Sequence, residues 1–347
     1  MFQVGLTRDF LMPDGSLAFG DIGLDLLEQA PGVKYEFLAE NMKELTADQV
    51  RDFDALLVLA PRVTGATLAG ADRLTVLARF GVGYDTVDVD ACTRNGVLLT
   101  ITPDGVRRPV ATSVIAFVLA LSHKLLVKDR LTRDARWGEK LAHMGVGLVG
   151  RVLGIVGFGN IGREVARLAA PFDLRIIAAD PYVTREQASA AGAELVDLDT
   201  LMRTADFVSV NCALTAETVH LIDARRLGLM KRTAFLINTA RGPVVEEPAL
   251  VAALRERRIA GAALDVFEQE PPDPANPLFT LDGVLLAPHA VCWTDECFLN
   301  IGRSACQSIL DVAAGRLPRH IVNRAVVETP RLQQKLRRHG GERQEGR

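Results

Sequence analysis

Two short apolar runs, residues 152–156 and 174–179, are joined by a glycine-rich turn and a helical pattern. The helical pattern covers residues 163–168, and the turn has the spacing G-x-G-x-x-G, with glycines at Gly157, Gly159 and Gly162. An apolar run that enters such a turn and leaves it as a helix predicts a strand, a tight turn and a helix start. This segment therefore constrains the chain to contain a parallel βαβ unit.

The glycine turn predicts a dinucleotide-binding site. Gly157 permits the tight turn, Gly159 lets the backbone approach a pyrophosphate, and Gly162 lets the helix pack closely on the strand. Asp180 ends the second apolar run, where its carboxylate can accept hydrogen bonds from ribose hydroxyls and repel a 2′-phosphate. Pro181 follows at a place where an arginine could otherwise hold that phosphate. NAD is therefore predicted in preference to NADP.

The same alternation of apolar runs and amphipathic segments extends through most of the chain. At 347 residues the chain is longer than one compact core usually requires, so two domains are expected. The rhythm is typical of parallel βαβ units and predicts an α/β protein with two doubly wound parallel sheets. The expected strands of the two sheets are residues 2–6, 35–38, 55–59, 75–78 and 97–100, and then 152–157, 174–179, 207–211, 234–238, 262–266 and 284–287.

Charge and cysteine content exclude several classes of function. A net charge of −3 provides no general basic field, so nucleic acid is not expected as a partner. The five cysteines include no C-x-x-C pair, which fits neither a disulfide framework nor a closed zinc site. The apolar segment 110–127 is interrupted by polar residues and is interpreted as a buried helix, not as a membrane span. With no secretory signal at the start, a cytoplasmic protein with reduced thiols and no metal is predicted.

Three polar side chains, Arg241, Glu270 and His289, each follow a short apolar run. Arginine can hold a carboxylate with two parallel N–H donors at any working pH. Histidine can donate or accept a proton near neutral pH, and a neighbouring carboxylate favours its protonated form. Together with a hydride donor, these groups are the parts needed to reduce a 2-keto acid.

The chain resembles the D-isomer-specific 2-hydroxyacid dehydrogenases over nearly its whole length, up to about Val322. Besides the glycine turn, the motifs that carry the resemblance are residues 79–85 (RFGVGYD), 238–242 (NTARG), 263–271 (ALDVFEQEP) and 287–289 (APH). The family implies a flavodoxin-like substrate domain and a Rossmann NAD-binding domain, with the active site in the cleft. It also implies a homodimer formed through the NAD-binding domain, with Trp137 on an exchanged arm.

The domain boundaries expected from the resemblance and the composition divide the chain into three parts. Residues 1–103 and 294–325 form the substrate domain, and residues 104–293 form the NAD-binding domain. Residues 326–347 are basic and lack an apolar period, so a disordered tail is predicted.

The resemblance implies a role for each of the three polar side chains. Arg241 would bind the substrate carboxylate and keto oxygen, His289 would serve as acid and base, and Glu270 would pair with His289. The substrate carboxylate would also lie on a loop formed by Gly81, Val82 and Gly83. Arg79, beside that loop, either reaches a second anionic group or forms a structural salt bridge.

The cofactor contacts implied by the resemblance extend beyond the glycine turn and Asp180. They are Asn160, Ile161 and Arg163, the last two at the pyrophosphate, and Cys212, Thr218, Thr239, Ala240 and Asp265 around the nicotinamide half. Other histidines lack comparable partners in the sequence and are interpreted as structural: His123, His143, His220 and His320.

The sequence departs from the common family pattern directly after His289. Bulky Trp293 either narrows the substrate pocket or packs between domains. Cys292 is interpreted as a pocket wall, because no second cysteine lies at redox spacing. The first of these interpretations predicts a small or flat keto acid, such as glyoxylate, hydroxypyruvate or a 3-phosphoglycerate-like compound.

Two alternatives remain at the level of sequence. The same trio of residues occurs in NAD-sensing corepressors of this superfamily, in which the fold is a binding module. Phosphite dehydrogenases also use a similar trio. Formate dehydrogenases of this fold place a glutamine where Glu270 stands, so the sequence favours hydroxyacid chemistry over formate oxidation.

Overall fold

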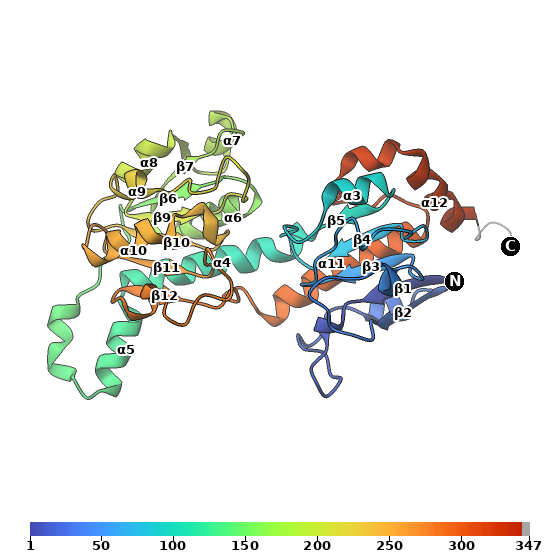
Figure 1. Cartoon of the computed structure of the whole chain (residues 1–347). Coiled ribbons are helices and arrows are strands. Elements are labelled where there is room, and N and C mark those ends of the chain that lie inside the picture. The colour runs from blue at the N-terminus through green and yellow to red at the C-terminus, as the bar shows by residue number, and fades with distance from the viewer. Residues whose placement is uncertain (342–347) are drawn as a thin grey trace. The chain divides into compact units, whose positions relative to one another are not determined.

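A computed structural model describes residues 1–341. The chain divides into two compact units. The first unit consists of Met1–Val106 and Trp293–Arg347, and the second unit consists of Arg107–Cys292. Each unit contains its own parallel sheet (Figure 1), which confirms the expected α/β class.

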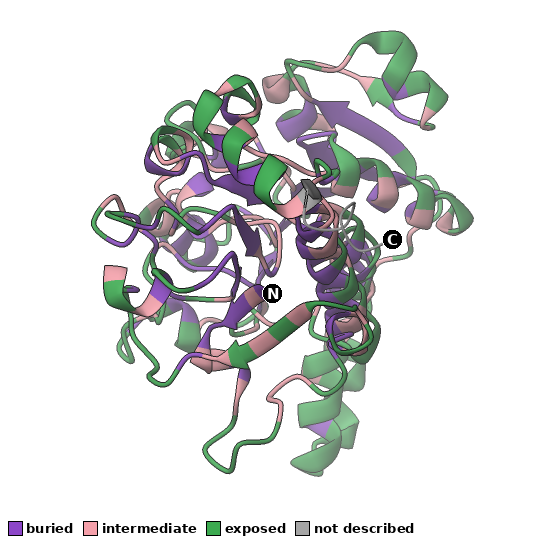
Figure 2. Cartoon of the chain, turned by 90° about the vertical axis from the view of Figure 1, so that its right-hand side faces the viewer, coloured by how far each residue is buried: buried purple, intermediate pink, exposed green. Residues whose placement is uncertain are grey.

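The sheet of the first unit has five parallel strands in the order β2-β1-β3-β4-β5. This order is that of flavodoxin-like folds. Strands β1, β3, β4 and β5 are largely buried, whereas β2 at the edge alternates between half-buried and exposed residues (Figure 2). All five expected strands are present: β1 (Phe2–Leu6), β2 (Val33–Phe37), β3 (Ala55–Val58), β4 (Val76–Arg79) and β5 (Leu98–Thr100).

Helix α11 (Asp295–Ala313) packs on β3 and β4 of the first unit. It begins after Thr294, whose hydroxyl accepts a hydrogen bond from the backbone N–H of Cys297 at 3.1 Å, as an N-cap residue does. The shorter helical segments of this unit are η1 (Arg8–Phe10), α1 (Asp25–Glu28), α2 (Ala47–Val50) and α3 (Val89–Arg94).

The expected disordered tail is wrong for the part of it that the structure describes. This part contains a 3₁₀ helix, η6 (Arg324–Glu328), and a helix, α12 (Pro330–Gly341). Leu332 and Leu336 are buried, and Lys335 Nζ donates hydrogen bonds to the carbonyl oxygens of Leu74 (2.6 Å) and Asn95 (2.9 Å). Two leucines four residues apart are enough to bury one side of a short helix, although they are a weak signal in a basic segment. Residues 342–347 of the expected tail lie outside the described residues.

The sheet of the second unit has seven parallel strands in the order β12-β11-β10-β9-β6-β7-β8. The order reverses at β6, as in Rossmann folds. Six strands match expected ones, and the two-residue β8 was too short to produce an apolar pattern. The strands are β6 (Val152–Val156), β7 (Arg175–Ala179), β8 (Glu194–Leu195), β9 (Phe207–Val210), β10 (Phe235–Asn238), β11 (Gly261–Leu264) and β12 (Val284–Leu286).

Helix α4 (Pro103–Ser122) is the one described helix that is long and apolar enough to cross a membrane. Of its most apolar window, 61% is buried within the structure, and Val114, Phe117 and Val118 belong to a core cluster of the second unit. The helix is therefore a core element, as the polar interruptions in the sequence predicted. The other helical segments of this unit are α5 (Leu125–Arg133), η2 (Trp137–His143), α6 (Asn160–Ala169), η3 (Ala170–Phe172), α7 (Arg185–Ala190), α8 (Leu198–Thr204), α9 (Ala224–Leu227), η4 (Gly242–Val244), α10 (Glu247–Arg255) and η5 (Pro277–Thr280).

Candidate active site

The glycine turn lies between β6 and α6, at the carboxyl end of the sheet. Gly157 has a φ of +88°, and a Cβ atom there would lie 2.6 Å from the backbone nitrogen of Cys212. A Cβ atom on Gly162 would lie 2.3 Å from the carbonyl oxygen of Gly157. A Cβ atom on Gly159 would meet no atom within 4 Å, so the backbone there is open to an approaching group. Two glycines thus serve close packing and the third leaves room for a ligand.

Asp180 lies directly after β7 and is fixed against the glycine turn. Its Oδ2 accepts a hydrogen bond from the backbone N–H of Phe158 at 2.7 Å, and its Oδ1 accepts one from Tyr182 at 2.8 Å. A carboxylate has about four acceptor positions, so it retains capacity for hydroxyl donors. Arg163 is also tied to the turn, because its Nε donates to the carbonyl oxygen of Phe158 at 3.1 Å.

These residues fit a dinucleotide. Helix α6 starts at Asn160 without a side-chain cap, so the N–H groups of its first turn can face an anion. Farther along the sheet, at the ends of β9 and β10, two buried side-chain oxygens have no hydrogen-bond partner among the described residues: Asn211 Oδ1 and Thr239 Oγ1. Unpaired buried polar atoms are rare in proteins and are commonly satisfied by a ligand or water.

The remaining predicted cofactor residues have mixed environments. Thr218 Oγ1 accepts from the backbone N–H of Thr215 and donates to the carbonyl oxygen of Ala213, both at 2.7 Å, so it organises its own loop. Burial raises the pKa of the Cys212 thiol to about 11, which keeps it neutral. Ile161 packs on the core, and the Ala240 N–H donates to Asn238 Oδ1 at 3.0 Å.

His289 and Glu270 form a direct pair in the second unit. His289 Nδ1 lies 2.7 Å from Glu270 Oε2, and Glu270 Oε1 accepts from the backbone N–H of Phe267 at 3.1 Å. The hydrogen bond to Glu270 raises the pKa of His289, against opposing effects of burial and of Arg241. Burial of Glu270 disfavours its ionisation, but the hydrogen bonds from His289 and Phe267 lower its pKa below the ordinary value. The pair therefore favours imidazolium beside carboxylate.

Asp265 fixes the loop that carries His289. It is 3% exposed, and its Oδ1 accepts hydrogen bonds from the backbone N–H groups of Ala290 (2.8 Å) and Val291 (3.0 Å). These bonds hold the chain where His289 adopts a left-handed φ of +56°. Burial raises the pKa of Asp265, although both backbone donors oppose the shift.

Arg241 lies on the neighbouring loop, after β10. Its Nη1 donates to the carbonyl oxygen of Ala240 at 2.7 Å, and its own carbonyl accepts from Asn238 Nδ2 at 3.0 Å. The next residue, Gly242, is pressed against the chain that leads to Glu270, because a Cβ atom there would lie 1.8 Å from the carbonyl oxygen of Phe267. The sheet order β12-β11-β10 thus brings the three predicted polar residues to adjacent loops.

The predicted substrate loop, residues 81–83, lies in the first unit shortly after β4, which ends at Arg79. Gly81 has a φ of +123°, and its N–H donates to Thr102 Oγ1 at 3.0 Å. Arg79 Nη1 donates to the carbonyl oxygen of Phe80 and, at 3.4 Å, to that of Val58. These bonds make Arg79 a support of the loop backbone. Val82 and Gly83 are half-buried.

Trp293 belongs to an aromatic cluster of the first unit. Its ring centroid lies 5.4 Å from that of Phe19 and 5.3 Å from that of Phe298, both in edge-on geometry. Phe80, which directly precedes the predicted substrate loop, also contacts this cluster, with its ring centroid 6.1 Å from that of Phe298. Because 53% of Trp293 is exposed, one side of its ring lies open beside these contacts.

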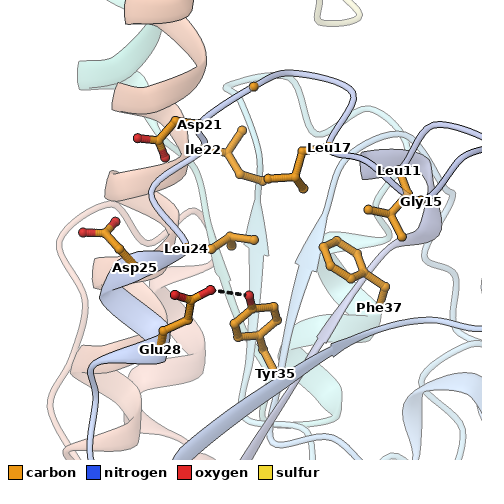
Figure 3. Close-up of a pocket in the computed structure, with 11 residues that line it drawn as sticks. Leu11, Gly15, Leu17, Asp21, Ile22, Leu24, Asp25, Glu28, Tyr35 and Phe37 are labelled. Atoms are coloured by element: carbon orange, nitrogen blue, oxygen red, sulfur yellow. Dashed lines mark hydrogen bonds between the residues drawn. The ribbon is translucent and has the colours of Figure 1, made fainter.

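A separate pocket in the first unit involves none of the predicted site residues. It has a volume of 520 Å³ and lies between edge strand β2 and the loop before α1. Figure 3 shows apolar side chains around it together with Asp21, Asp25 and Glu28, and a hydrogen bond from Tyr35 to Glu28. The Tyr35 hydroxyl donates to Glu28 Oε1 at 2.7 Å. A second cavity, of 780 Å³, is lined by residues of both termini, and it too lacks the predicted site residues.

Two of the histidines interpreted as structural have carboxylate partners that the sequence did not reveal. His220 Nε2 lies 2.5 Å from Glu268 Oε1, and His320 Nε2 lies 3.0 Å from Asp104 Oδ2. Both partners are far away in the sequence, so no local spacing indicated the pairs. Asn211, whose buried Oδ1 has no described partner, was not singled out from the sequence, although it lies at the end of an expected strand.

Known proteins similar in sequence to this chain define its family. Residues 115–291 match the family model of the NAD-binding domain of D-isomer specific 2-hydroxyacid dehydrogenases. The chain is 38% identical to a glyoxylate reductase from Korarchaeum cryptofilum, over 82% of this chain and 87% of that one. It is 35% identical to a D-3-phosphoglycerate dehydrogenase from Archaeoglobus fulgidus, over 86% of this chain but 56% of the longer relative.

Solved structures are similar over nearly the whole chain. A crystal structure of a Thermus thermophilus protein has a TM-score of 0.80 and 30% identity, over 92% of this chain and 100% of that one. A D-lactate dehydrogenase from Aquifex aeolicus also has a TM-score of 0.80, at 24% identity, over 92% of this chain and 99% of that one. The fold and site define an NAD-dependent oxidoreductase that acts on a CH–OH group. The chain belongs to the D-isomer specific 2-hydroxyacid dehydrogenase family.

Proposed function

We propose that the protein reduces a small 2-keto acid to the D-2-hydroxy acid, reversibly, with His289 as the proton donor and acceptor. The observation that carries this proposal is the 2.7 Å contact between His289 Nδ1 and Glu270 Oε2, on the loops next to Arg241. The contact holds one ring nitrogen, so Nε2 is the nitrogen that exchanges a proton with substrate. Bound NADH supplies the hydride.

The proposed roles of His289, Glu270 and Arg241 follow from the place where negative charge develops during the reaction. When hydride reaches C2 of a keto acid, negative charge builds on the keto oxygen, and protonated His289 neutralises it. Glu270 stabilises the imidazolium, whose pKa is raised by their hydrogen bond. Arg241 holds the substrate carboxylate and keto oxygen and so fixes the orientation of C2. In oxidation, neutral His289 takes the proton from the hydroxyl.

Binding of NAD uses the glycine turn and the loops beside it. The turn of Gly157, Gly159 and Gly162 would hold the pyrophosphate, and Asp180 the adenosine ribose. Thr239 and Asn211 offer buried oxygens toward the nicotinamide half. Asp265 is proposed to lie at the nicotinamide half and also to orient the His289 loop, since its Oδ1 accepts two backbone bonds from that loop.

The substrate class we propose is small: glyoxylate, hydroxypyruvate or a 3-phosphoglycerate-like acid. The similarity to glyoxylate reductases supports this class. So does Trp293, a bulky ring four residues after His289 that contacts Phe19 and Phe298. The N–H groups of Val82 and Gly83 are proposed to bind the substrate carboxylate. Gly81 and Arg79 are proposed to shape their loop, since the N–H of Gly81 donates to Thr102 Oγ1.

We also propose that the protein is a cytoplasmic homodimer formed through the second unit. The segment from α5 to Val149 exposes apolar side chains that a monomer has no reason to display: Leu125, Leu126, Trp137, Leu141, Met144 and Val149. A second copy of this chain, bringing the same segment, would cover them. Sedimentation of the protein and of a Trp137→Glu, Leu141→Glu variant tests this proposal, and a monomeric parent protein would refute it.

The direct test of the reaction is a substrate panel followed by NADH oxidation. We expect turnover of glyoxylate or hydroxypyruvate and a loss of about 10²- to 10⁴-fold in His289→Ala. Near-parental turnover in that variant would show that the proton-transfer role is wrong. Phosphite with NAD belongs in the panel, because the same three side chains serve phosphite oxidation. Failure with every acid and with phosphite would favour a NAD-sensing, corepressor-like binding protein.

A further inference from the structure

A second histidine–carboxylate pair lies next to the proposed catalytic pair in the second unit. His220 Nε2 and Glu268 Oε1 are 2.5 Å apart, and Glu268 precedes Glu270 by two residues. His220 adopts a left-handed φ of +51°, which is uncommon outside glycine. The His220 side chain thus reaches the loop that carries Glu270, although His220 and Glu268 are 48 residues apart in the sequence.

The backbone of His220 holds a second loop. Its N–H donates to the carbonyl oxygen of Pro243 at 2.8 Å, and the N–H of Ile222 donates to Val244 at 3.0 Å. Pro243 is two residues after Arg241. His220 therefore contacts the Arg241 loop through its backbone and the Glu270 loop through its ring.

The Glu268 side is equally well defined. The backbone N–H of Glu268 donates to Glu247 Oε2 at 3.1 Å, and Glu247 Oε1 accepts from Asn276 Nδ2 at 2.7 Å. The side chain of Glu268 is 27% exposed and that of His220 is 47% exposed, so the pair lies at the partly open edge of this loop. Between Glu268 and Glu270 the chain has little freedom, because the N–H of Phe267 binds Glu270 Oε1.

We propose that His220 and Glu268 are positioning residues that hold Glu270 in line with His289. The proposal rests on the proposed function, since it assigns a support to the pair that carries proton transfer. Neither residue touches the reacting atoms. Their contribution is to limit the positions of the residue 266–270 segment, so that Glu270 Oε2 stays within hydrogen-bond distance of His289 Nδ1.

The positioning role and a simple loss of charge at His220 predict different changes in the pKa of His289. The charged groups that act on His289 are Glu270, Asp265 and Arg241. Replacing His220 by glutamine removes at most a positive charge, and that change alone would raise the pKa of His289. A displaced Glu270 would instead lower it. The two explanations therefore predict opposite shifts for the same variant.

The test compares His220→Gln with Glu270→Gln in the whole protein, with NADH and the best keto acid of the panel. We expect His220→Gln to lower kcat by about tenfold with little change in the KM of NADH. We also expect its pH profile of kcat/KM for reduction to move to lower pH, by part of the shift seen in Glu270→Gln. A double variant with Glu270→Gln should show no further shift, because the positioned group is already gone.

Arg225→Gln is the matched control. It removes an exposed bidentate pair with Asp199 (2.6 and 2.9 Å) in the same unit and should leave the pH profile unchanged. An unchanged or alkaline-shifted profile in folded His220→Gln would overturn the positioning role. An unchanged profile in Glu270→Gln would instead overturn the proposed function, so the two failures are distinguishable. Circular dichroism and melting temperature confirm that each variant is folded.

Discussion

The Nδ1 atom of His289 lies 2.7 Å from the Oε2 atom of Glu270, although 19 residues separate them. Each partner supports the charged form of the other: the pKa of His289 is raised and that of Glu270 is lowered. Asp265 adds to this arrangement by fixing the loop after His289 with two backbone hydrogen bonds. The pair thus favours protonated His289, which is the form that the proposed reduction of a keto acid needs.

The first prediction concerns the pH dependence of reduction. Reduction requires protonated His289, so its rate should fall as pH rises through the raised pKa of that residue. Glu270→Gln removes the main cause of the raised pKa, and the fall should move to lower pH. At pH values between the midpoints of the two proteins, kcat/KM of Glu270→Gln should be lower than that of the parent by about tenfold or more. Profiles of NADH oxidation against pH measure this, and coincident midpoints would contradict the prediction.

Glu256→Gln is a suitable control for that measurement. Glu256 is exposed and pairs with Arg258 in the same unit, away from the described contacts of the three polar residues. Its removal changes the net charge by the same amount as Glu270→Gln and should leave the profile in place.

The second prediction concerns cofactor choice. Asp180→Ala removes the carboxylate that is fixed against the glycine turn by Phe158 and Tyr182. Hydrogen bonds to a charged group contribute about 1.5–3 kcal/mol, so the KM for NAD should rise about 10- to 100-fold. Because a charge that repels a 2′-phosphate is lost, the ratio of kcat/KM for NADP to that for NAD should increase. An unchanged ratio would be evidence against this role, and the KM of the keto acid serves as an internal control.

The third prediction concerns Lys335 and the stability of the first unit. Burial lowers the pKa of Lys335 to about 8, while its Nζ donates to Leu74 and Asn95. A lysine whose pKa is lower in the folded state carries its proton more readily in the unfolded chain. Between pH 8 and the ordinary lysine pKa of roughly 10.4, stability should therefore rise with pH. Below pH 8 Lys335 is protonated in both the folded and the unfolded state, so its burial lowers the free energy of unfolding by an amount that does not change with pH.

Chemical denaturation of the parent protein and of Lys335→Met checks this linkage. From pH 8 to 10 the parent should gain about 1 kcal/mol or more relative to the variant, since groups common to both cancel. Lys34→Met, which removes an exposed lysine on β2, should run parallel to the parent. If the free energies of unfolding of the parent and of Lys335→Met changed in parallel over this pH range, the lowered pKa of Lys335 would be disproved.

The fourth prediction concerns substrate size. Trp293→Ala removes the ring that packs against Phe19 and Phe298. If this ring limits the acid, the ratio of kcat/KM for phenylpyruvate to that for glyoxylate should increase by about tenfold or more, the value of a few methylene groups in a pocket. If the parent protein already preferred bulky aromatic acids to glyoxylate, Trp293 could not be the residue that limits the size of the acid.

Much of the second unit could be predicted because its signals are local. The strand, glycine turn, helix and acid of residues 152–180 are contiguous, and each residue type is required by backbone geometry at its own position. The structure bears this out at Gly157, where a side chain would collide with Cys212, and at Gly162, where it would collide with Gly157. Among the described strands of this unit, β8 alone was not expected, because it has two residues and no apolar period.

The misses share one physical cause. Helix α12 docks through a few contacts, notably Lys335 with carbonyl oxygens more than two hundred residues away, and nothing in a basic segment signals such partners. His220 and Glu268 likewise meet only because the loops after β9 and β11 flank the loop after β10.

The sequence by itself determined the α/β class, the dinucleotide turn and the chemical identity of Arg241, Glu270 and His289. These depend on periodicity, on glycine geometry and on side-chain type. Only the tertiary structure decided which groups pair: Glu270 with His289, Asp265 with the His289 loop, and His220 with Glu268. Pairing between distant residues depends on the order of strands in the sheet, and that order results from packing of the whole unit.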